Sequence, residues 1–123
     1  TAVVDERNEL SATENGRARF ELGPCTDVLV DVPKAQGAMM LLRGMNPQVI
    51  AMDEITQPED IRAIGEISGC GVAVLATAHG RSLAEMLRRP LYRELFEMGV
   101  FENLLTVSLS NGRRSYSLER LKT

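Results

Sequence analysis

Two adjacent carboxylates directly follow a short apolar run near the middle of the chain. The run is residues 49–52, Val-Ile-Ala-Met, and the acids are Asp53 and Glu54. In such a pair, one carboxylate holds the water shell of a magnesium ion, while its neighbour orients or deprotonates a water molecule that attacks a phosphate. This pattern is called Walker B. Acids in this position also serve as helix caps or solvated loop residues, so the pair alone leaves both interpretations open.

A second polar cluster follows the next apolar run, residues 72–76. It contains Thr77 and His79, the only histidine of the chain. Hydroxyl and imidazole groups donate hydrogen bonds to a terminal phosphate and so respond to its presence. The alternative role for His79 is a hydrogen bond to a backbone group where the next helix begins. Because Asp53 and Glu54 follow the preceding apolar run, we favour phosphate sensing for His79.

A third charged cluster lies at the start of the chain, where Asp5, Glu6 and Arg7 follow the apolar residues 2–4. The alternative here is a salt bridge within the triplet on the protein surface. Ligands bind at the carboxyl ends of the strands in parallel sheets. Because all three clusters follow apolar runs, we expect them to lie along one edge of a sheet.

The segments between these runs have the spacing of helices. Apolar residues recur at helical intervals over residues 34–43, and Thr56 with Glu59 has the capping-box spacing at the start of a second helix. The side chains expected to face the core are Ala35, Met39, Leu42 and Met45 in the first helix, and Ile61, Ile64 and Ile67 in the second. Alternation of strands and helices predicts an α/β fold with a mostly parallel sheet flanked by helices.

The last third of the chain has a different pattern. Ser82 and Glu85 repeat the capping-box spacing before one helix, and residues 91–98 are expected to form another. Residues 104–109 then alternate between apolar and polar, and Asn111-Gly112 is typical of a type I′ turn. The sequence therefore predicts a C-terminal β-hairpin.

Composition excludes several classes of function. The 123 residues carry a net charge of −3 and only 4% aromatic residues, which argues against direct binding to nucleic acid. No apolar run approaches the roughly 20 residues that cross a bilayer, so we expect no direct membrane insertion. Cys25 and Cys70 lack the spacing of a zinc or redox site. We expect a cytoplasmic protein with reduced thiols.

Five stretches resemble the stage III sporulation protein AA family, and together they extend over nearly the whole chain. They are residues 3–9 (VVDERNE), 26–29 (TDVL), 33–34 (PK), 45–54 (MNPQVIAMDE) and 76–80 (ATAHG). The resemblance implies a RecA-like, homo-oligomeric cytoplasmic ATPase of the mother cell, related to the ring-forming motors of type II and type IV secretion. Such a protein uses ATP and Mg²⁺ to power a membrane channel complex between mother cell and forespore.

The same resemblance implies roles for individual residues. Asp5 and Glu6 correspond to the acidic box of these motors, Asp53 and Glu54 to Walker B, and Thr77 to His79 to the histidine box. The catalytic residues would be Glu54, Asp53, Glu6 and His79, with Asp53 holding Mg²⁺ through water, and the nucleotide would be contacted by Asp5, Arg7, Thr77 and Arg43. Charge-stabilising arginines, acting across a subunit boundary, would come from Arg7, Arg43, Arg88 and Arg89, although solvated helix faces explain most arginines.

A phosphate-binding loop is missing from the sequence. The only lysines, Lys34 and Lys122, do not follow the GxxxxG pattern that such a loop requires. In the family that this chain resembles, the loop would precede Thr1, so we expect residues 1–123 to be a partial ATPase domain that is inactive alone. An absent central strand leaves open edges, which predicts self-association, a strand swap, or pairing of residues 72–76 with the hairpin.

Two other classes of function are alternatives to an ATPase. The first is a non-catalytic oligomerisation or regulatory module, whose strand-end acids are structural caps. The second is nucleic-acid remodelling, which the acidic balance and low aromatic content oppose.

Overall fold

The computed structural model describes residues 1–5 and 27–121 of the chain. It divides into two compact units, Thr1–His79 and Gly80–Thr123. Glu6, Arg7 and Cys25 lie outside the described residues. Among the described helices, none is long and apolar enough to cross a membrane.

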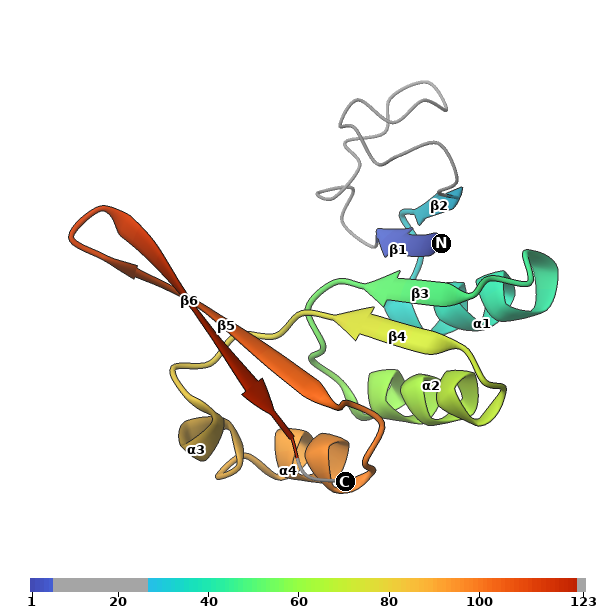
Figure 1. Cartoon of the computed structure of the whole chain (residues 1–123). Coiled ribbons are helices and arrows are strands. Elements are labelled where there is room, and N and C mark those ends of the chain that lie inside the picture. Colours follow the sequence, from blue (N-terminus) through green and yellow to red (C-terminus); the bar gives the residue numbers. More distant parts are fainter. Residues whose placement is uncertain (6–26, 122–123) are drawn as a thin grey trace. The chain divides into compact units, whose positions relative to one another are not determined.

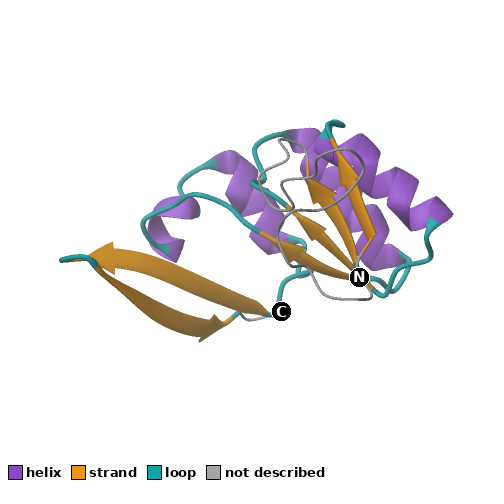
Figure 2. Cartoon of the chain, turned by 90° about the horizontal axis from the view of Figure 1, so that it is seen from above, coloured by secondary structure: helices purple, strands orange, loops and turns teal. Residues whose placement is uncertain are grey.

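The first unit is a parallel four-stranded sheet with two helices packed on it (Figure 1). Its elements are β1 (Ala2–Asp5), β2 (Asp27–Val30), α1 (Lys34–Gly44), β3 (Val49–Met52), α2 (Pro58–Gly69) and β4 (Ala73–Ala76), and the strand order is β2-β1-β3-β4. All three strand pairs are parallel. The steps from β2 to β3 and from β3 to β4 advance in the same direction, so right-handed crossovers place α1 and α2 on one face of the sheet (Figure 2). The predicted α/β architecture is confirmed.

The predicted core stripe is correct for α2 and wrong for α1. Ile61, Ile64 and Ile67 are buried as expected. In α1 the buried residues are Lys34, Gly37, Ala38 and Leu41, whereas Ala35, Met39 and Leu42 are half-buried and Met45 is 56% exposed. The reason is steric, because the small residues Gly37 and Ala38 let the helix approach β1 closely and turn that side inward.

The start of α2 also differs from the prediction by one residue. Pro58 occupies the first turn, which makes Gln57 the N-cap and Asp60 the reciprocal capping residue, in place of Thr56 and Glu59. The shorter side chain of Asp60 returns to the backbone N–H groups of Thr56 and Gln57, at 3.0 and 3.1 Å.

The second unit contains two short helices and a hairpin. They are α3 (Leu83–Met86), α4 (Pro90–Glu97), β5 (Asn103–Ser110) and β6 (Arg113–Arg120). The expected cap of α3 is present, since Ser82 Oγ accepts a hydrogen bond from the Glu85 N–H at 3.2 Å. The Glu85 carboxylate accepts hydrogen bonds from the Arg81 N–H and the Arg89 guanidinium, and these lower its pKa below the ordinary 4.5 of a glutamate. Glu85 is therefore charged near neutral pH.

The predicted hairpin is confirmed, and it forms a sheet of its own. Asn111 and Gly112 have φ angles of 51° and 75°, as a type I′ turn requires. β5 pairs with β6, whereas β4 is hydrogen-bonded to β3 and ends the parallel sheet. The two sheets lie in different units, so the expected pairing of residues 72–76 with the hairpin, like self-association or a strand swap, stays a prediction.

We predict that Gly37→Ala destabilises the first unit, whereas Gly44→Ala in the same helix does not. A Cβ at Gly37 would lie 2.7 Å from Val32 Cγ2 and 3.0 Å from Val4 Cγ1, and branched valines cannot swing away. At Gly44 nothing lies within 4 Å. Urea unfolding should show a loss of about 1–3 kcal/mol for Gly37→Ala and a change of zero to about +1 kcal/mol for Gly44→Ala. Equal stability of the two variants would contradict the close approach of α1 to β1.

Candidate active site

The carboxyl ends of three parallel strands meet at one edge of the first unit. Val4 is in register with Met52, and Met52 with Ala76, so the next residue of each strand lies at the same level. These residues are Asp5, Asp53 and Thr77. The structure thus brings Asp5, Asp53, Glu54, Thr77 and His79 to one edge, as their position after apolar runs predicts.

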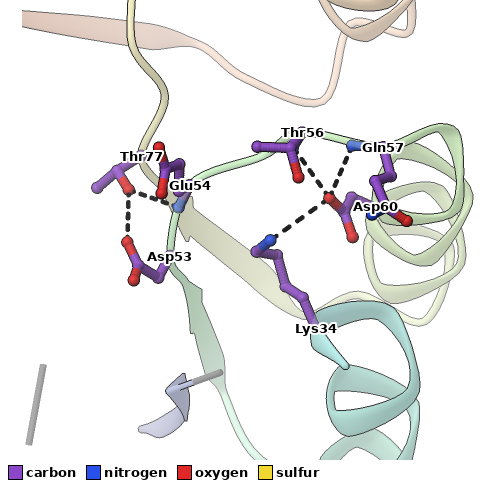
Figure 3. A network of polar contacts seen from close by, with 7 residues as sticks. All are labelled: Lys34, Asp53, Glu54, Thr56, Gln57, Asp60 and Thr77. Atoms are coloured by element: carbon purple, nitrogen blue, oxygen red, sulfur yellow. Dashed lines mark hydrogen bonds and ion pairs between the residues drawn. The ribbon is translucent and has the colours of Figure 1, made fainter. Parts of the chain in front are cut away.

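Thr77 connects the end of β4 to the loop that follows β3 (Figure 3). Its Oγ1 accepts a hydrogen bond from the Glu54 N–H at 2.8 Å and donates one to Asp53 Oδ1 at 3.3 Å. Its backbone carbonyl accepts the Ile55 N–H at 2.9 Å, and its own N–H donates to the Met52 carbonyl at 3.2 Å. Four hydrogen bonds therefore fix the two acids against Thr77.

Glu54 has an unusual backbone conformation that separates the two carboxylates. Its φ angle is +45°, in the left-handed region that residues other than glycine seldom adopt. Figure 3 shows the side chains of Asp53 and Glu54 pointing apart. The two acids therefore face different directions at this edge.

The Glu54 carboxylate lies against the imidazole of His79. Glu54 Oε1 is 3.3 Å from His79 Nε2, and the two side chains are 25% and 88% exposed. Protonation of the imidazole turns this contact into an ion pair. The imidazole is mostly exposed to solvent, whereas the Glu54 side chain is mostly buried.

Asp5 differs from the other acids in its burial. The residue is fully buried at the end of β1, and its carbonyl accepts a hydrogen bond from the Asp31 N–H at 3.2 Å. The alternative of a salt bridge within the triplet stays a prediction, because Glu6 and Arg7 lie outside the described residues. A buried carboxylate at a ligand-binding edge is costly unless it is bonded, so such positions are often functional.

Arg43 lies away from this edge, and its assignment as a nucleotide contact stays a prediction. It is in the last turn of α1, which runs from the carboxyl ends of the strands back to their amino ends. There it lines a depression with Pro47 and Val72, which precede β3 and β4. The helical spacing of the sequence predicts that Arg43 lies on a helix, but it does not tell at which edge of the sheet that end of the helix lies.

The other candidate arginines lie in the second unit or outside the described residues. Arg88 is exposed, while Arg89 donates to Glu85 Oε1 at 2.6 Å and lies 5.5 Å from the centre of the Tyr92 ring. Arg89 is therefore engaged within its own unit. Glu6 and Arg7 have no structural description.

Asp53 is the residue at this edge that could hold a hydrated Mg²⁺ ion. Within residues 1–5 and 27–121, no group of three or more His, Cys, Asp or Glu side chains is placed to hold a metal ion. Magnesium usually keeps several of its waters and binds proteins through one or two carboxylates together with substrate phosphates. The half-buried Asp53 carboxylate at the strand end has the chemistry for such a contact.

Sequence reasoning missed a buried ion pair beside this edge. Lys34 Nζ lies 3.5 Å from Asp60 Oδ2, and both side chains are only 6% exposed. A signal existed, because Lys34 precedes Gly37 and Leu41 at helical spacing, but lysine is rarely expected on the inner face of a helix.

The comparisons with known proteins decide the family. The description "Sporulation stage III, protein AA" belongs to the family profile that matches residues 1–115. The chain belongs to this family. It is 38% identical over 112 residues to the stage III sporulation protein AA of Bacillus subtilis (strain 168), covering 91% of this chain and 36% of that protein. The chain thus spans about a third of the length of its curated relative.

A solved structure of another protein has a similar fold. The X-ray structure of the Legionella pneumophila ATPase DotB matches with a TM-score of 0.56 at 17% sequence identity, over 95% of this chain and 44% of that one. At this identity the likeness establishes the fold alone. The chain shares with that structure a parallel sheet flanked by helices, as the alternation of strands and helices predicts.

We predict that Thr77→Val loosens the loop after β3, whereas Thr77→Ser does not. Valine keeps the shape but removes both the acceptor for the Glu54 N–H and the donor to Asp53. Because the site is exposed and water replaces part of the loss, the free energy of unfolding should fall by only about 1 kcal/mol. Hydrogen exchange at the Glu54 amide should accelerate in Thr77→Val only. Identical exchange in both variants would refute the role of Thr77.

Proposed function

We propose that this chain provides the catalytic edge of an ATPase that powers transport during sporulation. The observation that carries the proposal is the Thr77 network, which joins the Asp53-Glu54 pair to the Thr77-to-His79 cluster. Membership of the sporulation family and a fold shared with an ATPase support it. In this proposal Glu54 orients the attacking water, Asp53 holds hydrated Mg²⁺, and Thr77 and His79 respond to the terminal phosphate of ATP.

The contact between Glu54 and His79 suggests how hydrolysis is coupled to the substrate. His79 can leave Glu54 to donate a hydrogen bond to a terminal phosphate, because its side chain is 88% exposed. In this proposal, Glu54 Oε1 then accepts a proton from water. When bound, Mg²⁺ neutralises charge on the phosphate oxygens. The buried Asp5, as part of an acidic box with Glu6, would complete the polar lining of this edge.

Binding of the phosphates requires a loop that these 123 residues do not contain. We propose that another segment of a longer protein supplies it, and the relative that this chain matches is about two and a half times as long. Assembly as a homo-oligomeric ring would allow the exposed Arg43 to reach the site of a neighbouring subunit. The proposed setting is the mother-cell cytoplasm beside a membrane channel, without direct contact to nucleic acid or lipid.

We predict that the 123-residue chain alone neither hydrolyses ATP nor binds it tightly. Backbone amides and a lysine of a phosphate-binding loop make most of the interactions that bind the phosphates. Phosphate release should equal the buffer background, and calorimetry with Mg-ATP should give no tight binding. Measurable turnover by the chain alone would refute the missing-loop interpretation.

We predict that Glu54→Gln abolishes turnover in a chimaera whose matching segment of the Bacillus subtilis relative is replaced by this chain. The amide cannot accept a proton, so kcat should fall by about 10²-fold or more, while the nucleotide stays bound. Glu66→Gln on the exposed surface of α2 is the matched control and should leave kcat unchanged. If Glu54→Gln retains full activity, the proposed catalytic role is wrong.

A non-catalytic interaction module is the second candidate, and the hairpin favours it. One face of the hairpin carries Leu105, Val107 and Leu109 opposite Leu118, Tyr116 and Arg114. Its five large apolar side chains are between 57% and 73% exposed. Exposed apolar patches of this kind mark interaction sites. An interaction module would show no loss of function in Glu54→Gln, which separates the two candidates.

A further inference from the structure

One carboxylate oxygen of Asp60 lies at the centre of a second polar network (Figure 3). Asp60 Oδ2 accepts hydrogen bonds from the Thr56 and Gln57 N–H groups, and Lys34 Nζ lies 3.5 Å from the same oxygen. The three groups come from the loop before α2 and from the first residue of α1. This network therefore joins two helices to the loop that carries Glu54.

The burial of the pair indicates a role beyond stability. Lys34 and Asp60 are both 6% exposed, and removing two charges from water is so costly that buried ion pairs often stabilise a protein no more than apolar residues would. What the pair provides is geometry, because the ammonium fixes the carboxylate that orients two backbone N–H groups.

The loop from Asp53 to Gln57 is held at both ends. At the first end, Thr77 accepts hydrogen bonds from the Glu54 and Ile55 N–H groups. At the second end, Asp60 accepts those of Thr56 and Gln57. Glu54 lies between these anchors with its φ angle of +45°, a conformation that persists only where the surroundings impose it. Loss of either anchor releases that constraint.

Lys34 also connects this loop to the neighbouring strands. It begins α1 three residues after Asp31, whose N–H donates to the carbonyl of Asp5 at the end of β1. Lys34 thus follows a segment that is hydrogen-bonded to the end of β1, while its side chain contacts Asp60.

We propose that Lys34 is a positioning residue for Glu54, acting through Asp60. The catalytic task of Glu54 rests on the proposed function. The positioning of the loop by Lys34 does not depend on it. Lys34 touches neither substrate nor reacting atoms. It holds the distal anchor of the loop, so that the left-handed backbone at Glu54 presents the carboxylate in one direction.

The first test is hydrogen exchange in the 123-residue chain with Lys34→Met. If Lys34 positions the whole loop, exchange at the Glu54 and Ile55 amides should accelerate by about fivefold or more, although both bond to Thr77. If the pair only caps α2, acceleration should be confined to Thr56 and Gln57, and the proposal is overturned. Arg62→Met removes an exposed cation from α2 and should change neither set.

The second test is kinetic and uses the chimaera described above. Lys34→Met should lower kcat per bound nucleotide by about tenfold or more, with KM for ATP nearly unchanged, and Lys34→Arg should recover most of the loss. Counting sites with a non-hydrolysable ATP analogue removes any effect of a smaller folded fraction. If Lys34→Met keeps a kcat within twofold of the parent while Glu54→Gln is inactive, the positioning role is overturned and the proposed function is not. Full activity of Glu54→Gln would instead overturn the proposed function.

Lys34→Met leaves Asp60 as a buried charge and can fail to fold for that reason. The double variant Lys34→Met/Asp60→Asn removes both charges and keeps an oxygen acceptor for the Thr56 and Gln57 N–H groups. We expect it to fold and still to show the accelerated Glu54 exchange and the lower kcat. Exchange and kcat equal to the parent would show that the ion pair does not position the loop.

Discussion

The hydrogen bonds of Thr77 are the interaction on which the candidate site depends. Parallel pairing brings the ends of β3 and β4 to one level, but it does not aim the side chains that follow them. Thr77 does so with both its hydroxyl and its backbone, and it holds the left-handed Glu54 and the half-buried Asp53 in place. The division of labour between two adjacent acids follows from this single anchor.

Much of the fold was predictable because local pattern and global architecture agree. The β-branched strands, the isoleucine stripe of α2 and the Asn111-Gly112 turn each have one dominant structural solution. The orientation of α1 was not predictable in this way. Its apolar residues fit more than one helical face, and the face was chosen by Gly37, whose lack of a side chain matters only once β1 lies beside it.

The location of the candidate site was predictable from the sequence, but the contacts between its side chains were not. Position after apolar runs was enough to place Asp5, Asp53, Glu54, Thr77 and His79 at one edge. The distances that give them different tasks depend on backbone angles and on partners far away in the sequence. The Lys34–Asp60 pair shows the same limit, because 26 positions separate two charges whose contact exists only in the folded chain. The position of Arg43 was not predictable for a related reason, since a helix between parallel strands has one end at each edge of the sheet.

The left-handed backbone at Glu54 has a consequence for protein engineering. A residue with a Cβ in this conformation costs on the order of 1 kcal/mol relative to glycine or asparagine. A search for thermostable variants that ignores activity would therefore enrich substitutions at Glu54. In the proposed function this residue carries the catalytic carboxylate, so the loop after β3 would be a point of conflict between stability and catalysis.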